Sequence, residues 1–458
     1  MDKIRLLQQR KQNLLEVGKK VRQDISALID DKSFVELSAF SFSKNDFYGT
    51  DEQGEGVVTG YATINGFPFY IVAQNYEILS GGVSKANCAK ISRCLDEAEK
   101  TSTPVIYLLA SQGVQVGEGL GVMEGLSSII LKASRLKGTV NQYLIVNGEV
   151  YGFLSVLSAI CDFTYFIDKK SVLASSSPFV ISAKSGKNLS KFEVGGENGI
   201  KNANLVSFSV KSLKKIKKSI LSINELLSER ITDCGDLNSA IPELDKKTDY
   251  KTLLKIFDKG SVTEVGNSFS PEIKCLLGRI GGIAVAVTVF DGDNIFLNSH
   301  NVRKIRDFIE FVCCYSLPYI TFSNVLGIVP DMATNNSFVL KEIADYVSIF
   351  DCIDTAKISV IYKKAIGAGY SLFASKSIGF DYTFAFANAE ISLFDSEQGV
   401  EIEFSDEKAD KQKLAERYFN EKADPINSAK YGYVDNIIQP SLVRQYLISS
   451  LQMLLKRG

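Results

Sequence analysis

The chain has 458 residues, of which 45% are hydrophobic and 23% are charged, the balance of an ordinary globular protein. Its 52 Lys and Arg residues against 53 Asp and Glu residues leave a net charge of −1, so no overall charge attracts nucleic acid or an acidic membrane. Roughly three quarters of the unfolded surface can be buried at this length, which excludes disordered, collagen-like and mini-protein classes and predicts two or three domains.

The first half of the chain alternates helical and strand-like segments. Residues 3–30 have the pattern of an amphipathic helix, and residues 57–79 form a β-rich run. Residues 87–101 follow with apolar side chains at helical spacing. Residues 104–114 then form an apolar strand that ends in Gly113. A strand that ends in glycine and continues into a helix exposes backbone N–H groups at the edge of a sheet.

The second half repeats these segments in the same order. Residues 275–297 are β-rich, residues 302–316 have helical spacing, and residues 318–329 form an apolar strand that ends near Gly327. A last amphipathic helix is expected over residues 441–456.

One sequence offset relates the two halves. Pro104 and Pro318 are 214 residues apart (318 − 104), and so are Gly113 and Gly327 (327 − 113). Two buried strands often look alike by chance, but several features at one offset indicate an internal duplication.

The domain boundary is expected in residues 225–250, which are polar and rich in turn formers. We therefore predict one domain over residues 1–230 and another over residues 250–458. Apolar strands that alternate with helices predict an α/β fold class, with strands buried on both faces.

Membrane and secreted classes are not favoured. The most apolar run, residues 283–290, is far shorter than the ~20 residues of a membrane span. Residues 1–15 contain no apolar signal core. The eight cysteines are spread along the chain without a CxxC pair, which is typical of a reduced, cytoplasmic protein with buried thiols.

The most glycine-rich segment, residues 113–121, admits three interpretations. A dinucleotide-binding GxGxxG motif that starts at Gly117 would need glycine at position 122, which is Val122, and no GxxxxGK[ST] loop occurs. The segment can instead form part of an oxyanion hole, in which strand-end loops donate N–H groups to a developing enolate. Close backbone packing would also account for isolated glycines.

Side-chain chemistry is sparse elsewhere. The single histidine, His300, weakens any histidine triad or multi-histidine metal site and is expected to be structural or exposed. The basic run at residues 211–218 is typical of a solvated helix face. We expect the cysteines to lie in the core. Composition and spacing indicate a duplicated α/β protein and nothing narrower.

The order of several short motifs resembles one known family, the biotin-dependent acyl-CoA carboxyltransferases. This family includes propionyl-CoA carboxylase β subunits, methylmalonyl-CoA decarboxylase α subunits and transcarboxylases. The resemblance covers residues 15–456. The motifs that carry it are Ser33–Leu37, Gly54–Gly66, Gln74–Gly82, Lys90-Ile91, Lys364–Tyr370, Ala389–Ile391, Val400–Ile402, Tyr431–Asp435, Pro440 and Arg444.

The resemblance implies two tandem crotonase-like (ClpP/crotonase, spiral ββα) domains. It further implies an N-terminal domain for the acyl-CoA and a C-terminal domain for carboxybiotin, with active sites shared between subunits of at least a dimer. The cofactor would be biotin on a carrier protein, and the partners would be that carrier and a biotin carboxylase or decarboxylase subunit. Backbone N–H pairs would stabilise the thioester enolate and the biotin ureido oxygen.

Carried over by position, the resemblance implies two oxyanion holes. The first would be formed by Gly113 and Val114 together with Gly152 and Phe153. The second would be formed by Gly327 and Ile328 together with Gly367 and Ala368, which would also bind the biotin.

The motifs depart from the family at several positions. The family usually has Ser-Gly-Gly-Ala-Arg where this chain has Ser111-Gln-Gly-Val-Gln115, and Ala-Gly-Gly-Ala where it has Tyr151-Gly-Phe-Leu154. Pro-Gly-Phe is replaced by Leu326-Gly-Ile328. A usual Arg-His-Gly-Ala-Lys aligns with Lys341–Asp345, which loses positive charge. Since any residue but proline offers an N–H, the donors survive, although Phe153 occupies space near the thioester.

Three functions follow from these observations. The first is a working carboxyltransferase subunit that moves a carboxyl group between carboxybiotin and the α-carbon of an acyl-CoA. The second is a catalytically degenerate paralogue that serves as a structural partner of a complete subunit. The third is another crotonase-type reaction, thioester hydrolysis or isomerisation, with Glu118 or Glu124 as the required carboxylate.

Overall fold

The computed structural model describes residues 3–42, 55–405 and 410–455. Gly54 of the quoted motif and residue 456 of the expected terminal helix lie outside these ranges. The chain divides into two compact units, Met1–Asn224 and Glu225–Gly458. The division falls within helix α9 (Leu213–Ser228).

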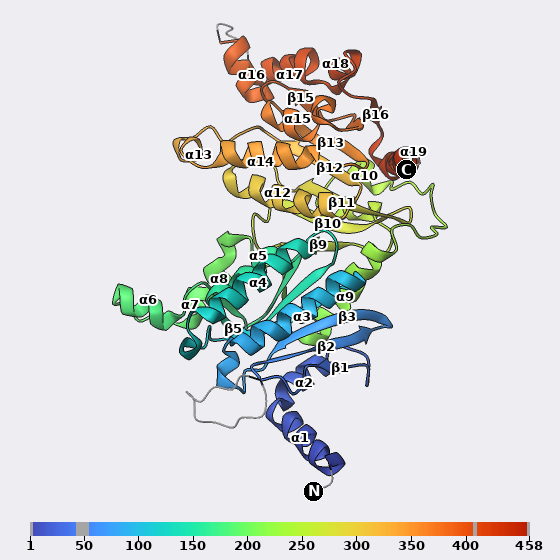
Figure 1. The fold of residues 1–458 in the computed structure, drawn as a ribbon. Coiled ribbons are helices and arrows are strands. Elements are labelled where there is room, and N and C mark those ends of the chain that lie inside the picture. Colours follow the sequence, from blue (N-terminus) through green and yellow to red (C-terminus); the bar gives the residue numbers. More distant parts are fainter. Residues whose placement is uncertain (1–2, 43–54, 406–409, 456–458) are drawn as a thin grey trace. The chain divides into compact units, whose positions relative to one another are not determined.

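The first unit is built on an eight-stranded sheet of order β1-β2-β3-β4-β5-β6-β8, with β7 paired to β5 (Figure 1). From β3 to β8 the neighbouring strands are parallel. The strands are β1 (Val35–Leu37), β2 (Val57–Ile64), β3 (Phe67–Gln74), β4 (Val105–Ser111), β5 (Gln142–Tyr151), β6 (Phe163–Ile167), β7 (Val172–Ala174) and β8 (Phe208–Val210).

Helices cover this sheet. Helices α3 and α4 pack together and run side by side in Figure 1, and their apolar faces share one core with β4 and β5. The α-helices of the first unit, before α9, are α1 (Lys3–Val17), α2 (Lys19–Ser26), α3 (Lys85–Thr101), α4 (Leu120–Leu136), α5 (Leu157–Ile160), α6 (Pro178–Ser185), α7 (Lys191–Gly195) and α8 (Glu197–Ile200).

The second unit has an eight-stranded sheet of order β16-β14-β13-β12-β11-β10-β9, with β15 paired to β13. Its strands are β9 (Thr263–Val265), β10 (Ile273–Ile280), β11 (Ile283–Phe290), β12 (Tyr319–Val325), β13 (Lys357–Ile366), β14 (Tyr382–Phe386), β15 (Glu390–Ser392) and β16 (Asn436–Ile438). Its helices are α10 (Glu243–Lys246), α11 (Tyr250–Leu253), α12 (Ser299–Cys314), α13 (Met332–Asn335), α14 (Val339–Asp351), α15 (Ala368–Phe373), α16 (Ser396–Glu403), α17 (Lys411–Tyr418), α18 (Pro425–Lys430) and α19 (Val443–Leu455).

The two sheets share their central topology, which confirms the duplicated α/β fold. Strands β2 to β6 correspond to β10 to β14, and the short strands β7 and β15 pair with the equivalent strands β5 and β13. Strand β4 shifts its register against β5 between Leu109 and Ser111. Strand β12 shifts against β13 between Ser323 and Val325, at the same offset of 214.

Local sequence explains why the equivalent elements form. The β2–β3 hairpin turns at Asn65 and Gly66, and the β10–β11 hairpin turns at Gly281 and Gly282. All four residues have positive φ, as a two-residue turn between twisted strands requires. All seven residues of β4 and all seven of β12 are buried, in agreement with the expected buried strands.

The segment between the halves is part of the second unit rather than a free linker. Ile231 forms a β-bridge with Ile283, and the Ile241 N–H donates to the carbonyl of Ser441. Ile241 and Leu244 are buried in the second core.

Candidate active site

In the first unit, two neighbouring strand ends place glycine at the same edge of the sheet. Ser111 of β4 is the register partner of Val150 of β5, and Gly113 and Gly152 each lie two residues beyond these partners. Gly113 has φ +120° and Gly152 has φ +77°, conformations that L side chains rarely adopt. A Cβ atom at either position would meet nothing within 4 Å, so the space beside both loops is open.

In the loop after β4, the N–H of Val114 points away from Val83, the residue with which Val114 forms a β-bridge. The Val83 N–H donates to the carbonyl of Gly113 (2.9 Å), and the Gln115 N–H donates to the carbonyl of Val83 (2.8 Å). In a parallel bridge of this kind, the N–H of the intervening residue, Val114, points to the opposite side. Because Val83 follows β3 and the sheet order is β3-β4-β5, that side is the β5 side.

The loop after β5 offers a second N–H. Phe153 is the first residue of a short 3-10 helix, η4 (Phe153–Val156), so its N–H has no partner within that helix. The preceding Gly152 N–H donates to the carbonyl of Ala174 (3.2 Å). The Phe153 side chain is 41% exposed. Two backbone donors therefore stand at one sheet edge, an arrangement that can stabilise an oxyanion.

The second unit repeats this arrangement. The Leu297 N–H donates to the carbonyl of Gly327 (2.7 Å) and the Val329 N–H donates to the carbonyl of Leu297 (3.0 Å), which turns the Ile328 N–H to the other side. Gly367 donates to the carbonyl of Ser392 (3.0 Å), and the next residue begins α15.

All eight residues predicted from the sequence thus lie at strand ends, four in each unit. Gly327 has φ +99° and Gly367 has φ +50°. Val325 is the register partner of Ala365, so these two glycines also lie two residues beyond paired positions. Ala368 is the first residue of α15 and, like Phe153, offers an N–H without a partner inside its helix.

A group of polar side chains beside the first pair of loops was not predicted. Glu149 on β5 accepts hydrogen bonds from Gln112 and Tyr151, and its other carboxylate oxygen is paired with Lys191 of α7. Partial burial opposes ionisation, but the hydrogen bonds from Lys191, Gln112 and Tyr151 lower the pKa of Glu149 below its usual value. Positions 149 and 151 lie on one face of a strand, a spacing that could have suggested their contact.

Glu118 and Glu124, the alternative carboxylates named for hydrolysis or isomerisation, both lie in the segment after β4. Glu118 accepts a hydrogen bond from the Lys85 N–H (2.6 Å) at the first residue of α3. This contact satisfies one of the unpaired donors at that helix end. Glu124 is exposed on α4.

Other candidate groups are structural. The His300 ring is exposed and packs edge-on against Phe269. Four cysteines (Cys88, Cys94, Cys161 and Cys275) are buried as expected, whereas Cys234, Cys313 and Cys314 are only half-buried and Cys352 is exposed. Within the described ranges, no group of His, Cys, Asp and Glu side chains could hold a metal ion.

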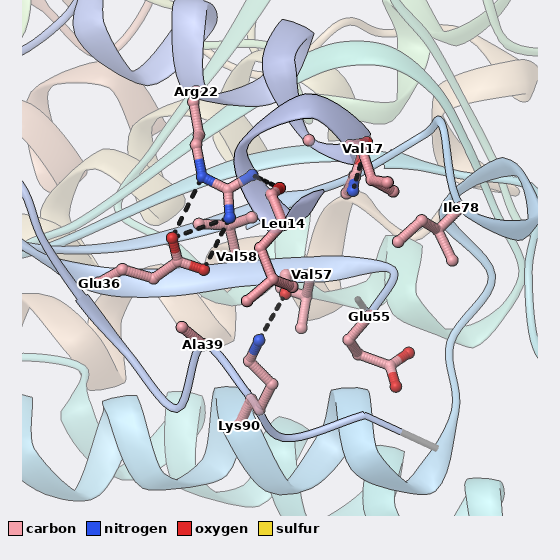
Figure 2. Close-up of a pocket in the computed structure, with 12 residues that line it drawn as sticks. Leu14, Val17, Arg22, Glu36, Ala39, Glu55, Val57, Val58, Ile78 and Lys90 are labelled. Carbon is pink, nitrogen blue, oxygen red and sulfur yellow. Dashed lines mark hydrogen bonds and ion pairs between the residues drawn. The ribbon is translucent and has the colours of Figure 1, made fainter. Parts of the chain in front are cut away.

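Figure 2 shows a small pocket of the first unit, lined by α1, α2 and the start of β2 among other segments. Its charged groups have partners: Arg22 is paired with Glu36 (2.8 Å), and the buried Lys90 ammonium donates to the carbonyl of Val57 (2.9 Å). None of the eight predicted residues lines it.

Comparison with known proteins identifies the family. The sequence model of the family described as the carboxyl transferase domain matches residues 15–458. The chain is 27% identical to the methylmalonyl-CoA decarboxylase subunit alpha of Propionigenium modestum, over 94% of this chain and 89% of that protein. It is 26% identical to the propionyl-CoA carboxylase carboxyltransferase subunit of Haloferax mediterranei, over 94% and 90%.

Among solved structures, the transcarboxylase 12S hexamer with methylmalonyl-coenzyme A and methylmalonic acid bound has the same fold. It superimposes with a TM-score of 0.89 over 98% of this chain and 94% of that chain, at 23% sequence identity. The family and the fold expected from the sequence are both confirmed.

Proposed function

Because the chain belongs to the carboxyl transferase domain family, we propose that it moves a carboxyl group between carboxybiotin on a carrier protein and the α-carbon of an acyl-CoA thioester. The observation that carries the proposal is the presence, in each unit, of two backbone N–H groups at neighbouring strand ends. The names of the relatives, which refer to propionyl-CoA and methylmalonyl-CoA, support a short acyl-CoA thioester as the substrate.

The first unit is proposed to hold the acyl-CoA. The N–H groups of Val114 and Phe153 bind the thioester oxygen. Negative charge develops on that oxygen when the thioester becomes an enolate. Donors placed in advance at that oxygen stabilise the charge without reorganisation, and one such donor contributes about 100- to 1,000-fold to a rate. The positive φ of Gly113 and Gly152 supports this role because it turns the two loops while leaving the space beside them open.

The second unit is proposed to hold biotin. Support comes from Gly327, where a Cβ would meet only the Ile366 carbonyl oxygen at 3.7 Å, so there is space beside that loop. The Ile328 and Ala368 N–H groups bind the ureido oxygen. When bound, carboxybiotin would supply the carboxyl group, and biotin would accept it in the reverse direction.

The proposed partners are a biotin carrier protein and a biotin carboxylase or decarboxylase subunit, with this chain in an oligomer of at least two copies in the cytoplasm. Of the helices that the structure describes, none is long and apolar enough to span a membrane. The departures at Gln112, Tyr151 and Phe153 do not favour the partner-only paralogue over transfer, because every proposed donor position keeps an N–H group.

The test is a transfer assay with purified protein, free biotin or a matched biotin carrier, and a panel of carboxylated CoA thioesters that includes malonyl-CoA and methylmalonyl-CoA. We expect biotin-dependent loss of the carboxyl group from at least one thioester. A folded protein that is silent with every thioester, even with the carrier present, would contradict the proposal and favour the partner-only function.

A further inference from the structure

Five side chains of the first unit meet around one carboxylate, and we call them the Glu149 cluster: Tyr76, Gln112, Glu149, Tyr151 and Lys191. The Gln112 side-chain amide donates to Glu149 Oε2 (2.9 Å) and to the Tyr76 hydroxyl (2.8 Å). The Tyr151 hydroxyl donates to the same Oε2 (3.1 Å). The Lys191 ammonium donates to the other oxygen, Oε1 (2.8 Å).

The cluster joins the two loops that carry the proposed donors. Gln112 directly precedes Gly113 in the loop after β4, and Tyr151 directly precedes Gly152 at the end of β5. Both side chains bind one oxygen atom, Glu149 Oε2. The carboxylate therefore connects the two loops through side chains, in addition to the backbone pairing of β4 with β5. This pairing is irregular here, because the β4–β5 register shifts just before Ser111.

The link is shielded from water on the Glu149 and Tyr151 side, whereas Gln112 and Lys191 are exposed. The Tyr151 ring is buried, and the Glu149 side chain is 22% exposed. Hydrogen bonds to a charged acceptor are stronger than those between neutral groups, and partial burial reduces their competition with water. Lys191 neutralises the carboxylate from α7, a different segment of the chain.

At the corresponding described positions of the second unit, such a link cannot form. The positions equivalent to Gln112 and Tyr151 are Leu326 and Ile366, which cannot hydrogen-bond through their side chains. Gln112 and Tyr151 are also two positions at which the chain departs from the family motifs. The side chains at these two positions bind the same carboxylate, so the two departures together form one polar support for the loops rather than two independent losses of a family motif.

We propose that Glu149 is a positioning residue, which holds the two loops of the first unit so that the Val114 and Phe153 N–H groups converge on one substrate oxygen. This inference rests on the proposed function. A misplacement of about 1 Å between reacting groups costs on the order of 100-fold in rate, so a carboxylate that does not touch the substrate still controls turnover.

The test compares Glu149→Gln and Glu149→Ala with the wild type. Glutamate accepts from Gln112 and Tyr151 on one oxygen and from Lys191 on the other. Glutamine has only one acceptor oxygen, so it cannot accept from all three donors in this arrangement. The matched control is Asp96→Asn, which breaks the Asp96–Lys132 pair between α3 and α4 of the same unit.

The first readout, amide hydrogen exchange, does not depend on activity. Loss of the link is expected to speed exchange roughly tenfold in both loops, at the hydrogen-bonded amides of Gln112, Gln115, Gly152 and Ser155. Asp96→Asn should leave these amides unchanged. Unchanged exchange in both Glu149 variants, or faster exchange in only one loop, would overturn the positioning role whether or not the protein transfers carboxyl groups.

The second readout separates kcat from KM. Positioning of the donors predicts a fall in kcat of roughly 10- to 100-fold with KM for the acyl-CoA within about twofold, because the lost interaction matters at the developing charge. A raised KM with unchanged kcat in Glu149→Ala would overturn the proposal. An inactive wild type would instead contradict the proposed function. If Glu149→Ala does not fold, Gln112→Leu, which removes the donor from the loop after β4 and leaves the Glu149–Lys191 pair in place, decides the question.

Discussion

Lys90 and Lys304 lie 214 residues apart, and each donates to a backbone carbonyl at or shortly before the first strand of the hairpin in its unit. Each is buried on the helix that follows the first hairpin, α3 or α12. The Lys90 ammonium donates to the carbonyl of Val57 (2.9 Å), and the Lys304 ammonium donates to the carbonyls of Phe269 (2.6 Å) and Ser270 (3.1 Å). The duplication therefore extends to buried polar contacts, not only to the order of the strands.

These lysines predict a pH dependence of stability. Burial lowers the pKa of both ammonium groups. Between the lowered folded value and about 10.4, the unfolded chain binds more protons, so the free energy of unfolding rises with pH. We expect Lys304→Met and Lys90→Met each to remove part of this rise, up to about 1.4 kcal/mol per pH unit.

The measurement is urea unfolding of the wild type and each variant between pH 7.5 and 10. The control is Lys100→Met, since Lys100 is exposed at the end of α3. The buried thiols are present in all these proteins, but burial raises the pKa of the Cys275 thiol and the charge of Lys304 lowers it. Among the described residues, Lys90 shifts no thiol in this way, so Lys90→Met gives the cleaner comparison. A variant with the same slope as the wild type would contradict the role of burial.

A proline substitution tests the Phe153 N–H as a donor. Phe153 is the first residue of η4, a position where proline fits a helix, so Phe153→Pro removes both the N–H and the phenyl side chain without breaking the helix. We expect kcat for transfer to fall by about 100- to 1,000-fold. Phe153→Ala keeps the N–H and should stay within about tenfold of the wild type. Equal losses in both variants would show that the side chain, not the donor, matters.

Gly367→Val tests the second pair of loops. Valine at φ +50° is strained, and its Cβ would lie 3.2 Å from the Leu393 carbonyl oxygen, so the loop must shift. We expect transfer to be abolished while circular dichroism and the melting temperature show a folded protein. Unchanged transfer in the folded variant would contradict the assignment of this loop to the site.

The segment Lys341–Asp345, which has lost positive charge relative to the family motif, contains an acidic residue that pairs with two arginines of the neighbouring helix α12. Glu342 of α14 is buried and is paired with Arg303 (2.6 Å) and Arg306 (2.6 Å) of α12. Removal of one partner from a buried ion pair leaves uncompensated charge. Since both arginines are partly exposed, we expect Glu342→Ala to lower the free energy of unfolding by about 2–4 kcal/mol.

Chemical denaturation of this variant is compared with that of Glu421→Ala. Glu421 pairs with Arg417 at the surface, where an ion pair contributes about 0–1 kcal/mol. Similar losses in the two variants would show that burial of Glu342 adds nothing.

The sequence alone was sufficient for the duplicated α/β fold, the family and the positions of the strand-end glycines. These features are encoded locally. Alternation of apolar residues marks strands and helices, and glycine marks backbone with positive φ, as at Gly113 and Gly327. The offset of 214 residues needs only a comparison of the chain with itself.

Only the tertiary structure decided which side chains support the loops and where the chain divides. Glu149 and Lys191 are 42 residues apart, and Tyr76 lies in another segment, so no short-range pattern predicts their contact. The division within α9 likewise depends on whether residues 229–250 pack against the first core or the second. Local preferences act over a few residues, whereas these contacts form only once the sheets bring distant segments together.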